Sequence, residues 1–176
     1  MILVDLGFRV PESVTSCCCD TLRAFVRAGP AVSKTVCGLR ADTEIATEAD
    51  FEAFDPASGP VHLQRQIIGS DARIHVIGDR LIAQRVSAGG VDYRREGRLN
   101  ELESFEPPAP VHTLLMEGTM RLGLHFAGWD FKIDENDTYW CLEVNSMPGY
   151  SSYDEQCGGS ISKTLLQYLA STHTNI

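Results

Sequence analysis

Two runs of alternating apolar and polar residues, separated by a turn-rich centre, occupy residues 125–150 of the 176-residue chain. The first run reads His-Phe-Ala-Gly-Trp-Asp-Phe-Lys-Ile, the centre Asp-Glu-Asn-Asp, and the second run Thr-Tyr-Trp-Cys-Leu-Glu-Val-Asn. Alternation on both sides of a turn predicts a β-hairpin. With a two-residue turn at residues 136–137, counting back along both strands places Asp130 directly opposite Glu143.

This register sorts the hairpin into two faces, because directly opposite residues share a face of the sheet. The apolar face carries Trp129, Phe131, Ile133, Trp140, Leu142 and Val144. The polar face carries Asp130, Lys132, Cys141, Glu143 and Asn145. A slip of one residue would mix the two sets, so the pattern itself supports the register. We therefore expect the apolar set to be buried.

The polar face brings together two carboxylates and one amide oxygen, from Asp130, Glu143 and Asn145. Hard oxygen ligands without a thiol or an imidazole suit Mg²⁺ or Mn²⁺ better than zinc. Mg²⁺ takes few protein ligands and completes its octahedron with water and substrate phosphates, so these residues indicate the handling of nucleotide phosphates. The alternative from the hairpin alone is an ordinary solvated sheet face, where acidic residues are common.

Gly-Trp-Asp at residues 128–130 and Leu-Glu-Val-Asn-Ser-Met-Pro-Gly at residues 142–149 resemble the metal-binding end of the ATP-grasp superfamily. The resemblance is strongest to the branch of RimK-type glutamate ligases and of ligases that crosslink ribosomal peptides. That branch holds magnesium on ATP with an aspartate followed by Glu-x-Asn, which implies that Asp130, Glu143 and Asn145 are metal ligands. It also implies an α+β fold in which two lobes of antiparallel sheet and helices hold ATP between them.

Composition limits the other classes of function. The formal net charge of −9 argues against a nucleic-acid or anionic-membrane binder, since both need a basic surface. The six cysteines form no Cys-x-x-Cys pair, which predicts a reduced, cytoplasmic protein. The adjacent Cys17, Cys18 and Cys19 leave a soft-metal or redox site as a minor alternative.

The first third of the chain is expected to form the first lobe. Residues 16–28 have a helical pattern, and residues 30–34 predict a short strand that ends in Lys34. By the resemblance, Lys34 contacts the ATP phosphates, and the loop that follows covers them. This loop holds a single glycine, Gly38, where family loops hold more, so Arg40 is expected to supply charge there.

Residues 61–68 predict the next strand. In the family, this strand leads into a hinge whose backbone contacts the adenine edge. The residues that match the hinge are Gln64, Arg65, Gln66 and Ile67. The resemblance therefore implies that these four bind the nucleotide.

A second hairpin is predicted around Gly78 and Asp79, with Asp71, Arg73 and His75 on one face. Asp71-Ala72-Arg73 matches the Asp-x-Arg of the family, which implies that Asp71 binds the ribose hydroxyls. Arg73 would then lie toward phosphate or substrate as a catalytic residue. We expect His75 to be a structural residue of the sheet rather than a catalytic base.

Downstream, Asp92-Tyr93-Arg94 matches a family segment whose arginine reaches the phosphates, so Arg94 is expected to bind ATP and to act in catalysis. Glu96 stands where the family has asparagine. From the residues alone, each arginine is also compatible with a solvated surface charge. Residues 111–122 predict an amphipathic helix beneath the metal hairpin, and residues 161–170 a last helix.

We therefore expect a first lobe at about residues 12–60, and a hinge with a second lobe at about residues 61–176. Complete ATP-grasp ligases begin with a further amino-terminal domain, and by the resemblance we expect the chain to start after it. The chain would then be a fragment, a shortened domain, or one subunit whose partner chain supplies that domain.

The function that the resemblance implies is an ATP-dependent carboxylate–amine ligase using Mg²⁺ or Mn²⁺. In that reaction, the terminal phosphate of ATP moves to a carboxylate, and an amine then attacks the acyl phosphate. The carboxylate and amine substrates are unknown and could be an amino acid, a peptide or a protein. No nucleic-acid or membrane partner is expected. The alternative is a nucleotide-binding module without ligase activity of its own.

Overall fold

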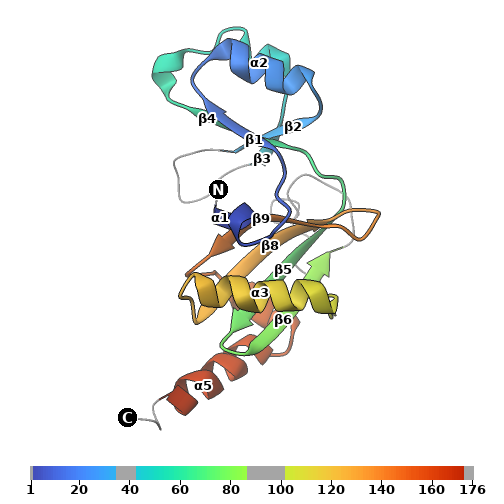
Figure 1. Cartoon of the computed structure of the whole chain (residues 1–176), viewed down its shortest axis with the longest axis vertical. Helices are drawn as coiled ribbons and strands as arrows, with labels where there is room; N and C mark the ends of the chain where they lie inside the picture. Colours follow the sequence, from blue (N-terminus) through green and yellow to red (C-terminus); the bar gives the residue numbers. More distant parts are fainter. Residues whose placement is uncertain (1, 35–42, 87–101, 173–176) are drawn as a thin grey trace. The chain divides into compact units, whose positions relative to one another are not determined.

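The computed structural model describes residues 2–34, 43–86 and 102–172. The chain divides into two compact units, one formed by Met1–Val10 with Ile68–Ile176 (unit 1) and one by Pro11–Ile67 (unit 2). Each unit has its own antiparallel sheet with helices, which confirms the α+β class (Figure 1). None of the described helices combines the length and the apolar character needed to cross a membrane.

Unit 2 is built on a four-stranded sheet in the order β1-β4-β2-β3. Its strands are β1 (Ser13–Ser16), β2 (Ala31–Lys34), β3 (Thr43–Ala46) and β4 (Val61–Arg65). Helix α2 (Cys19–Arg27) buries Leu22 and Phe25 in a cluster with Ala31 and Leu63 of the sheet. Two short 3₁₀ turns, η1 (Glu48–Phe51) and η2 (Pro56–Ser58), lie between β3 and β4.

Two boundaries of unit 2 differ from the sequence expectation. The helix expected from residue 16 begins at Cys19, because residues 13–16 pair with β4 as an edge strand. Strand β4, expected to open the second lobe, is instead a central strand of this sheet and pairs with both β1 and β2. The division between the units therefore follows Ile67 rather than residue 60.

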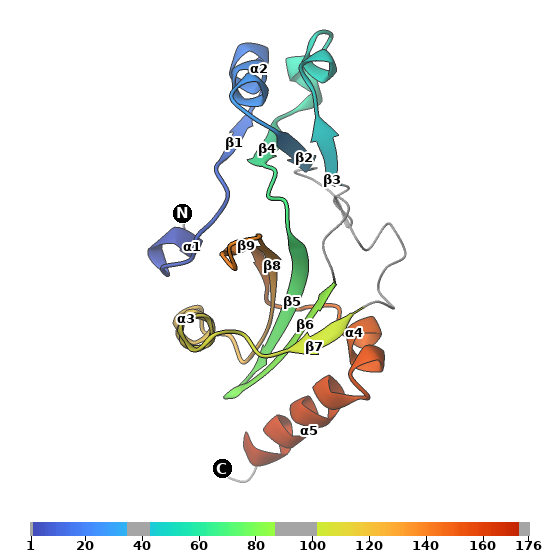
Figure 2. The same cartoon turned by 90° about the vertical axis from the view of Figure 1, so that its right-hand side faces the viewer.

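Unit 1 is built on a five-stranded sheet in the order β7-β6-β5-β8-β9. Its strands are β5 (Ser70–Ile77), β6 (Arg80–Val86), β7 (Glu103–Phe105), β8 (Phe126–Ile133) and β9 (Tyr139–Asn145). Its helices are α1 (Ile2–Asp5), α3 (Ala109–Arg121), α4 (Ser151–Gln156) and α5 (Ser160–Thr172). Figure 2 shows α3 on one side of this sheet and α4 with α5 on the other. Both predicted hairpins, β5–β6 and β8–β9, are confirmed.

Helix α3 packs beneath the β8–β9 hairpin, as predicted. Phe8 stacks on Trp129 with ring centroids 4.6 Å apart, and both rings lie against Gly118 of α3. A Cβ at Gly118 would come within 2.9 Å of Phe8 and 3.2 Å of Trp129, so a glycine permits this close approach. The buried indole of Trp129 donates to Thr119 Oγ1 at 3.0 Å, which satisfies its polar atom.

The β8–β9 register contains an irregularity that the alternating pattern did not reveal. Asp130 pairs with Glu143, as predicted, but the next residue, Phe131, pairs with Cys141. Leu142 is therefore an extra residue on β9, which is the signature of a β-bulge. The predicted two-residue turn thus paired Asp130 correctly with Glu143. Between these residues and the turn, however, the register of the two strands is shifted by one residue.

The bulge changes the faces of Cys141 and Trp140 and leaves Leu142 unpaired on β9. Cys141 was predicted on the polar face, but it is fully buried in the core, because it lies opposite Phe131. Trp140 was predicted to be buried, but it lies opposite Lys132 and is only half-buried; its indole donates to Asp134 Oδ2 at 2.9 Å. Leu142 is half-buried as well. Those three assignments were wrong, because strict alternation assumes an unbroken ladder.

Candidate functional site

Three neighbouring strands of unit 1 gather charged side chains on one face. Arg73 of β5 lies directly opposite Asp130 of β8, and Asp130 lies opposite Glu143 of β9. Asp71 lies opposite Lys132 in the same β5–β8 ladder. Opposite residues share a face, so the sheet brings the predicted metal ligands together with Asp71 and Arg73.

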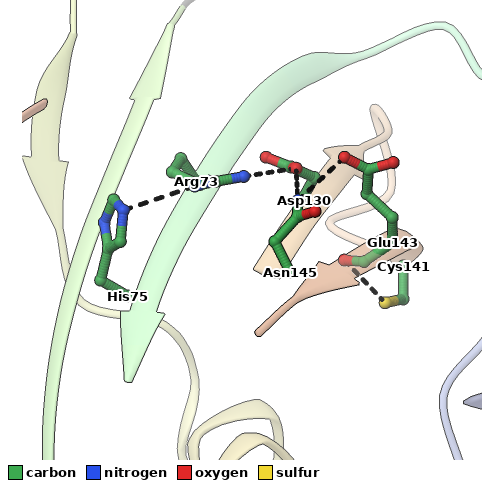
Figure 3. A network of polar contacts seen from close by, with 6 residues as sticks. All are labelled: Arg73, His75, Asp130, Cys141, Glu143 and Asn145. Atoms are coloured by element: carbon green, nitrogen blue, oxygen red, sulfur yellow. Dashed lines mark hydrogen bonds and ion pairs between the residues drawn. The ribbon is translucent and has the colours of Figure 1, made fainter. Parts of the chain in front are cut away.

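The three predicted metal ligands contact one another (Figure 3). Asn145 Nδ2 donates to Glu143 Oε1 at 3.0 Å and to Asp130 Oδ2 at 3.4 Å. The two carboxylates and the amide thus form one compact group at the end of β9. Glu143 is exposed, whereas the side chain of Asp130 is only 16 % exposed.

Asp130 is held in an electrostatically strained position. Burial, with a smaller contribution from the neighbouring Glu143, raises the pKa of its carboxyl to about 6 against the opposing effect of Arg73. Arg73 Nη1 lies 2.5 Å from Asp130 Oδ2, in an ion pair whose members are both largely buried. Asp130 therefore lies where added positive charge would stabilise its ionised form.

The donor set fits a hard divalent cation. It consists of two carboxylates and an amide oxygen, and Mg²⁺ commonly takes one or two carboxylates with water and substrate phosphates. Within the described ranges, no group of three or more His, Cys, Asp or Glu side chains could hold a metal.

Arg73 is enclosed on several sides. Its Nε donates to His75 Nε2 at 3.4 Å, and its guanidinium lies 5.4 Å from the centre of the Tyr153 ring. A Cβ at Gly128 would come within 2.8 Å of Arg73 Cζ and 2.6 Å of Pro148 Cβ. The glycine of the Gly-Trp-Asp motif thus leaves room for both the guanidinium and the proline.

His75 is a buried sheet residue. Burial lowers the pKa of its imidazole to about 3, and the nearby positive charge of Arg73 acts in the same direction. A neutral imidazole can accept the hydrogen bond from Arg73 through Nε2. His75 therefore supports Arg73 as an acceptor.

Lys132 is a site residue to which the sequence assigned no role. Its ammonium donates to Asp71 Oδ2 at 2.8 Å, and their side chains are 9 % and 15 % exposed. The contact follows from the pairing of β5 with β8, which brings together residues 61 positions apart in the sequence. No local sequence pattern indicates such a pairing.

Lys34 ends β2 in unit 2, as predicted, and is half-buried. It lies directly opposite His62 of β4. Burial lowers the pKa of His62, and the positive charge of Lys34 lowers it further. Arg40 and Arg94 lie outside the described residues.

The predicted hinge residues have contacts within unit 2. Gln64 is buried in the central strand, and Ile67 is half-buried. Arg65 donates to Glu12 Oε2 and to the Gly29 carbonyl, and its guanidinium lies 3.7 Å from the Phe25 ring centre. The backbone N–H groups of Arg65 and Gln66 donate to the carbonyls of Glu12 and Pro30. These two N–H groups and the Arg65 side chain thus already serve the fold of unit 2.

Comparisons with known proteins identify the class. No model of a protein family matches the sequence. The fold matches a Chryseobacterium gregarium RiPP-associated ATP-grasp ligase, solved with ADP and with a leader and core peptide, at a TM-score of 0.86 and 18 % identity over 97 % of this chain and 57 % of that one. It also matches D-alanine–D-alanine ligase from Bacillus anthracis, solved with ATP, at a TM-score of 0.66 and 15 % identity over 99 % of this chain and 64 % of that one. The chain therefore has the ATP-grasp fold.

The sequence comparison narrows this class. A Shewanella oneidensis protein named "Probable alpha-L-glutamate ligase 1" is 29 % identical over 134 residues, which cover 73 % of this chain and 44 % of that protein. A Shewanella baltica protein of the same name is 30 % identical over the same shares. The chain is thus a RimK-like ATP-grasp domain, which confirms the resemblance, and it spans less than half the length of these curated relatives.

Proposed function

We propose that this chain carries the metal–nucleotide site of an ATP-dependent carboxylate–amine ligase. The observation that carries the proposal is the convergence of Asp130, Glu143 and Asn145 on one face of the larger sheet. The likeness to proteins named as glutamate ligases supports the class of reaction. The fold it shares with an ATP-grasp ligase solved with ADP and peptides supports a nucleotide as one substrate.

In this proposal, Asp130, Glu143 and Asn145 hold a magnesium ion, which when bound neutralises phosphate charge. Arg73 keeps Asp130 in place through their ion pair and lies beside the ligand group. Lys34, and Arg94 by its resemblance to the family, supply further positive charge to the phosphates. Asp71 binds the ribose hydroxyls.

The proposed reaction needs no side-chain nucleophile. An oxygen of the substrate carboxylate attacks the terminal phosphorus of ATP, the bond to ADP breaks, and an acyl phosphate forms. The amine nitrogen then attacks the acyl carbon, inorganic phosphate leaves with the carbon–oxygen bonding electrons, and the amine loses a proton to solvent. The protein contributes chiefly by positioning the reactants and neutralising charge.

The substrates that fit this proposal are amino acids or peptides. The curated relatives are named for glutamate, and a macrocyclase of the same fold from Microcystis aeruginosa was solved with its precursor peptide, at a TM-score of 0.83 and 16 % identity over 97 % of this chain and 57 % of that one. The alternative is a nucleotide-binding module without ligase activity of its own. Release of ADP with pooled amino-acid and peptide substrates would separate the two.

The direct test is a melting scan with ATP and Mg²⁺. At a hundredfold excess over the dissociation constant, a ligand that binds only the folded state stabilises it by about 2.7 kcal/mol, which raises the melting temperature by roughly 5–10 °C at this size. The increase should require Mg²⁺ and should shrink strongly in Glu143→Gln. Glu155→Gln, an equivalent change at an exposed position on α4, should keep it. No shift at millimolar ATP in the unmodified protein would contradict the proposal.

A further inference from the structure

Lys132 is a buried cation on the face that carries the metal-ligand group. Its relative exposure is 7 %, and lysine is rarely buried without a partner for its charge. That partner is Asp71, directly opposite on β5, with Nζ and Oδ2 2.8 Å apart. The contact therefore joins one residue without an assigned role to another that is expected to bind ribose.

The Lys132–Asp71 pair is one of two ion pairs between β5 and β8. Two residues along the same ladder, Arg73 lies opposite Asp130 and contacts its carboxylate. In the Lys132–Asp71 pair the cation comes from β8, whereas in the Arg73–Asp130 pair it comes from β5. Each of these carboxylates is thus held by a cation from the neighbouring strand.

The chemistry of the pair suits a carboxylate that must accept further hydrogen bonds. A lysine ammonium has three donors and no acceptor, so it contacts Asp71 only as a donor. An ionised carboxylate offers about four acceptor sites on its two oxygens, so it can accept from Lys132 and from ligand hydroxyls together. The ion pair also limits rotation of a carboxylate that is only 15 % exposed.

We infer that Lys132 is a positioning residue, which orients the Asp71 carboxylate toward the hydroxyls of a ribonucleotide and so sets the preference for ribose over deoxyribose. The inference rests on the proposed function, because it requires that the chain bind ATP. It adds a determinant of sugar specificity that acts through Asp71 rather than by touching the nucleotide.

The test is the ratio of the dissociation constants for 2′-deoxy-ATP and ATP, measured with Mg²⁺ by calorimetry. The unmodified protein should bind ATP about tenfold or more tightly than 2′-deoxy-ATP. A factor of this size corresponds to the usual free energy of a hydrogen bond to a charged group. Lys132→Met should bring the ratio close to one, whereas Lys132→Arg, which keeps the charge, should retain much of the preference. Lys163→Met, a loss of the same charge on α5, should leave the ratio unchanged.

A double-mutant cycle separates positioning from a merely structural ion pair. If Lys132 acts through Asp71, Lys132→Met should not change the ratio further in an Asp71→Asn background. If Lys132→Met does not fold, Lys132→Gln replaces it, with the same expected loss of the preference for ATP over 2′-deoxy-ATP. The Asp71→Asn/Lys132→Met double variant removes both charges together.

Two results would overturn the inference while leaving the proposed function in place. One is a folded Lys132→Met or Lys132→Gln variant that prefers ATP as strongly as the unmodified protein. The other is ATP binding by the unmodified protein without any preference over 2′-deoxy-ATP. Absence of binding for both nucleotides in the presence of Mg²⁺ would overturn the inference together with the proposed function.

Discussion

Asp130 and Glu143 lie directly opposite each other across β8 and β9, although the ladder shifts by one residue immediately beyond that pair. The extra residue, Leu142, lies next to Glu143, so the bulge adjoins the proposed metal ligands. Bulges are common beside active sites, where they re-aim side chains. Because of this shift, the side chain of Cys141 lies in the core, while the side chain of Glu143 lies on the opposite face of the sheet.

The hairpin core should respond strongly to loss of volume. Phe131 is 1 % exposed and lies in the cluster beneath the ligand face. Phe131→Ala should lower the free energy of unfolding by roughly 3–5 kcal/mol, through lost burial and the cavity that remains. Urea denaturation measures this change. Met120→Ala, at a side chain that is 73 % exposed, should stay within about 0.5 kcal/mol; a loss under about 1 kcal/mol at Phe131 would contradict its place in the core.

Gly128→Ala should destabilise the protein by crowding. The added Cβ would lie 2.6 Å from Pro148 Cβ and 2.8 Å from Arg73 Cζ, so at least one of them must move. Overpacking of this kind costs roughly 1–3 kcal/mol in denaturant titrations. The matched control is Gly149→Ala, where an added Cβ meets nothing within 4 Å. Equal stability of the two variants would show that Gly128 is not confined as described.

The hairpins and the pairing of Asp130 with Glu143 could be predicted from sequence because their signals are local. Asp130 and Glu143 were paired by counting from one turn, and the polar and apolar alternation around them is explicit in the chain. The same reasoning failed at Cys141 and Trp140, because nothing in a short alternating run marks the position of a bulge. The error is confined to the few residues between the bulge and the turn.

The contacts between distant strands could not be predicted in this way. The Lys132–Asp71 pair depends on which hairpins lie side by side, and this pairing follows from the whole sheet rather than from any one segment. The contacts of Arg65 were missed for the same reason, since Glu12 lies 53 positions away in sequence. Local patterns thus predicted the Asp130–Glu143 pair but missed the contacts that Lys132 and Arg65 make with residues far away in sequence.

Lys34→Ala should weaken ATP binding more than adenosine binding. The proposed contact of Lys34 is with phosphate, which adenosine lacks, so loss of the ammonium removes an attraction that only ATP experiences. Titration of each ligand into both proteins gives the two ratios of dissociation constants. An equal loss for ATP and adenosine would indicate a general disturbance of β2 and would argue against a phosphate contact.

The stability of the protein should fall in mild acid because of His75. Burial lowers the pKa of this imidazole to about 3 in the folded state, with Arg73 acting in the same direction and Asp154 against it. The unfolded chain has a histidine pKa near 6.5, so between about pH 6.5 and pH 3 the unfolded state binds a proton that the folded state does not. The contribution of His75 is therefore fully present above that range and is lost as the pH falls, by about 1.4 kcal/mol per pH unit.

Urea denaturation at pH 7 and pH 5 measures the difference, and His75→Gln removes the titrating group. Asp130 and the other acids titrate in both proteins, so the difference between them isolates the histidine. The unmodified protein should lose about 2 kcal/mol more than His75→Gln over this interval. His112→Gln, at an exposed position on α3, should behave as the unmodified protein does. Equal losses in the unmodified protein and His75→Gln would mean that the imidazole is not held neutral beside Arg73.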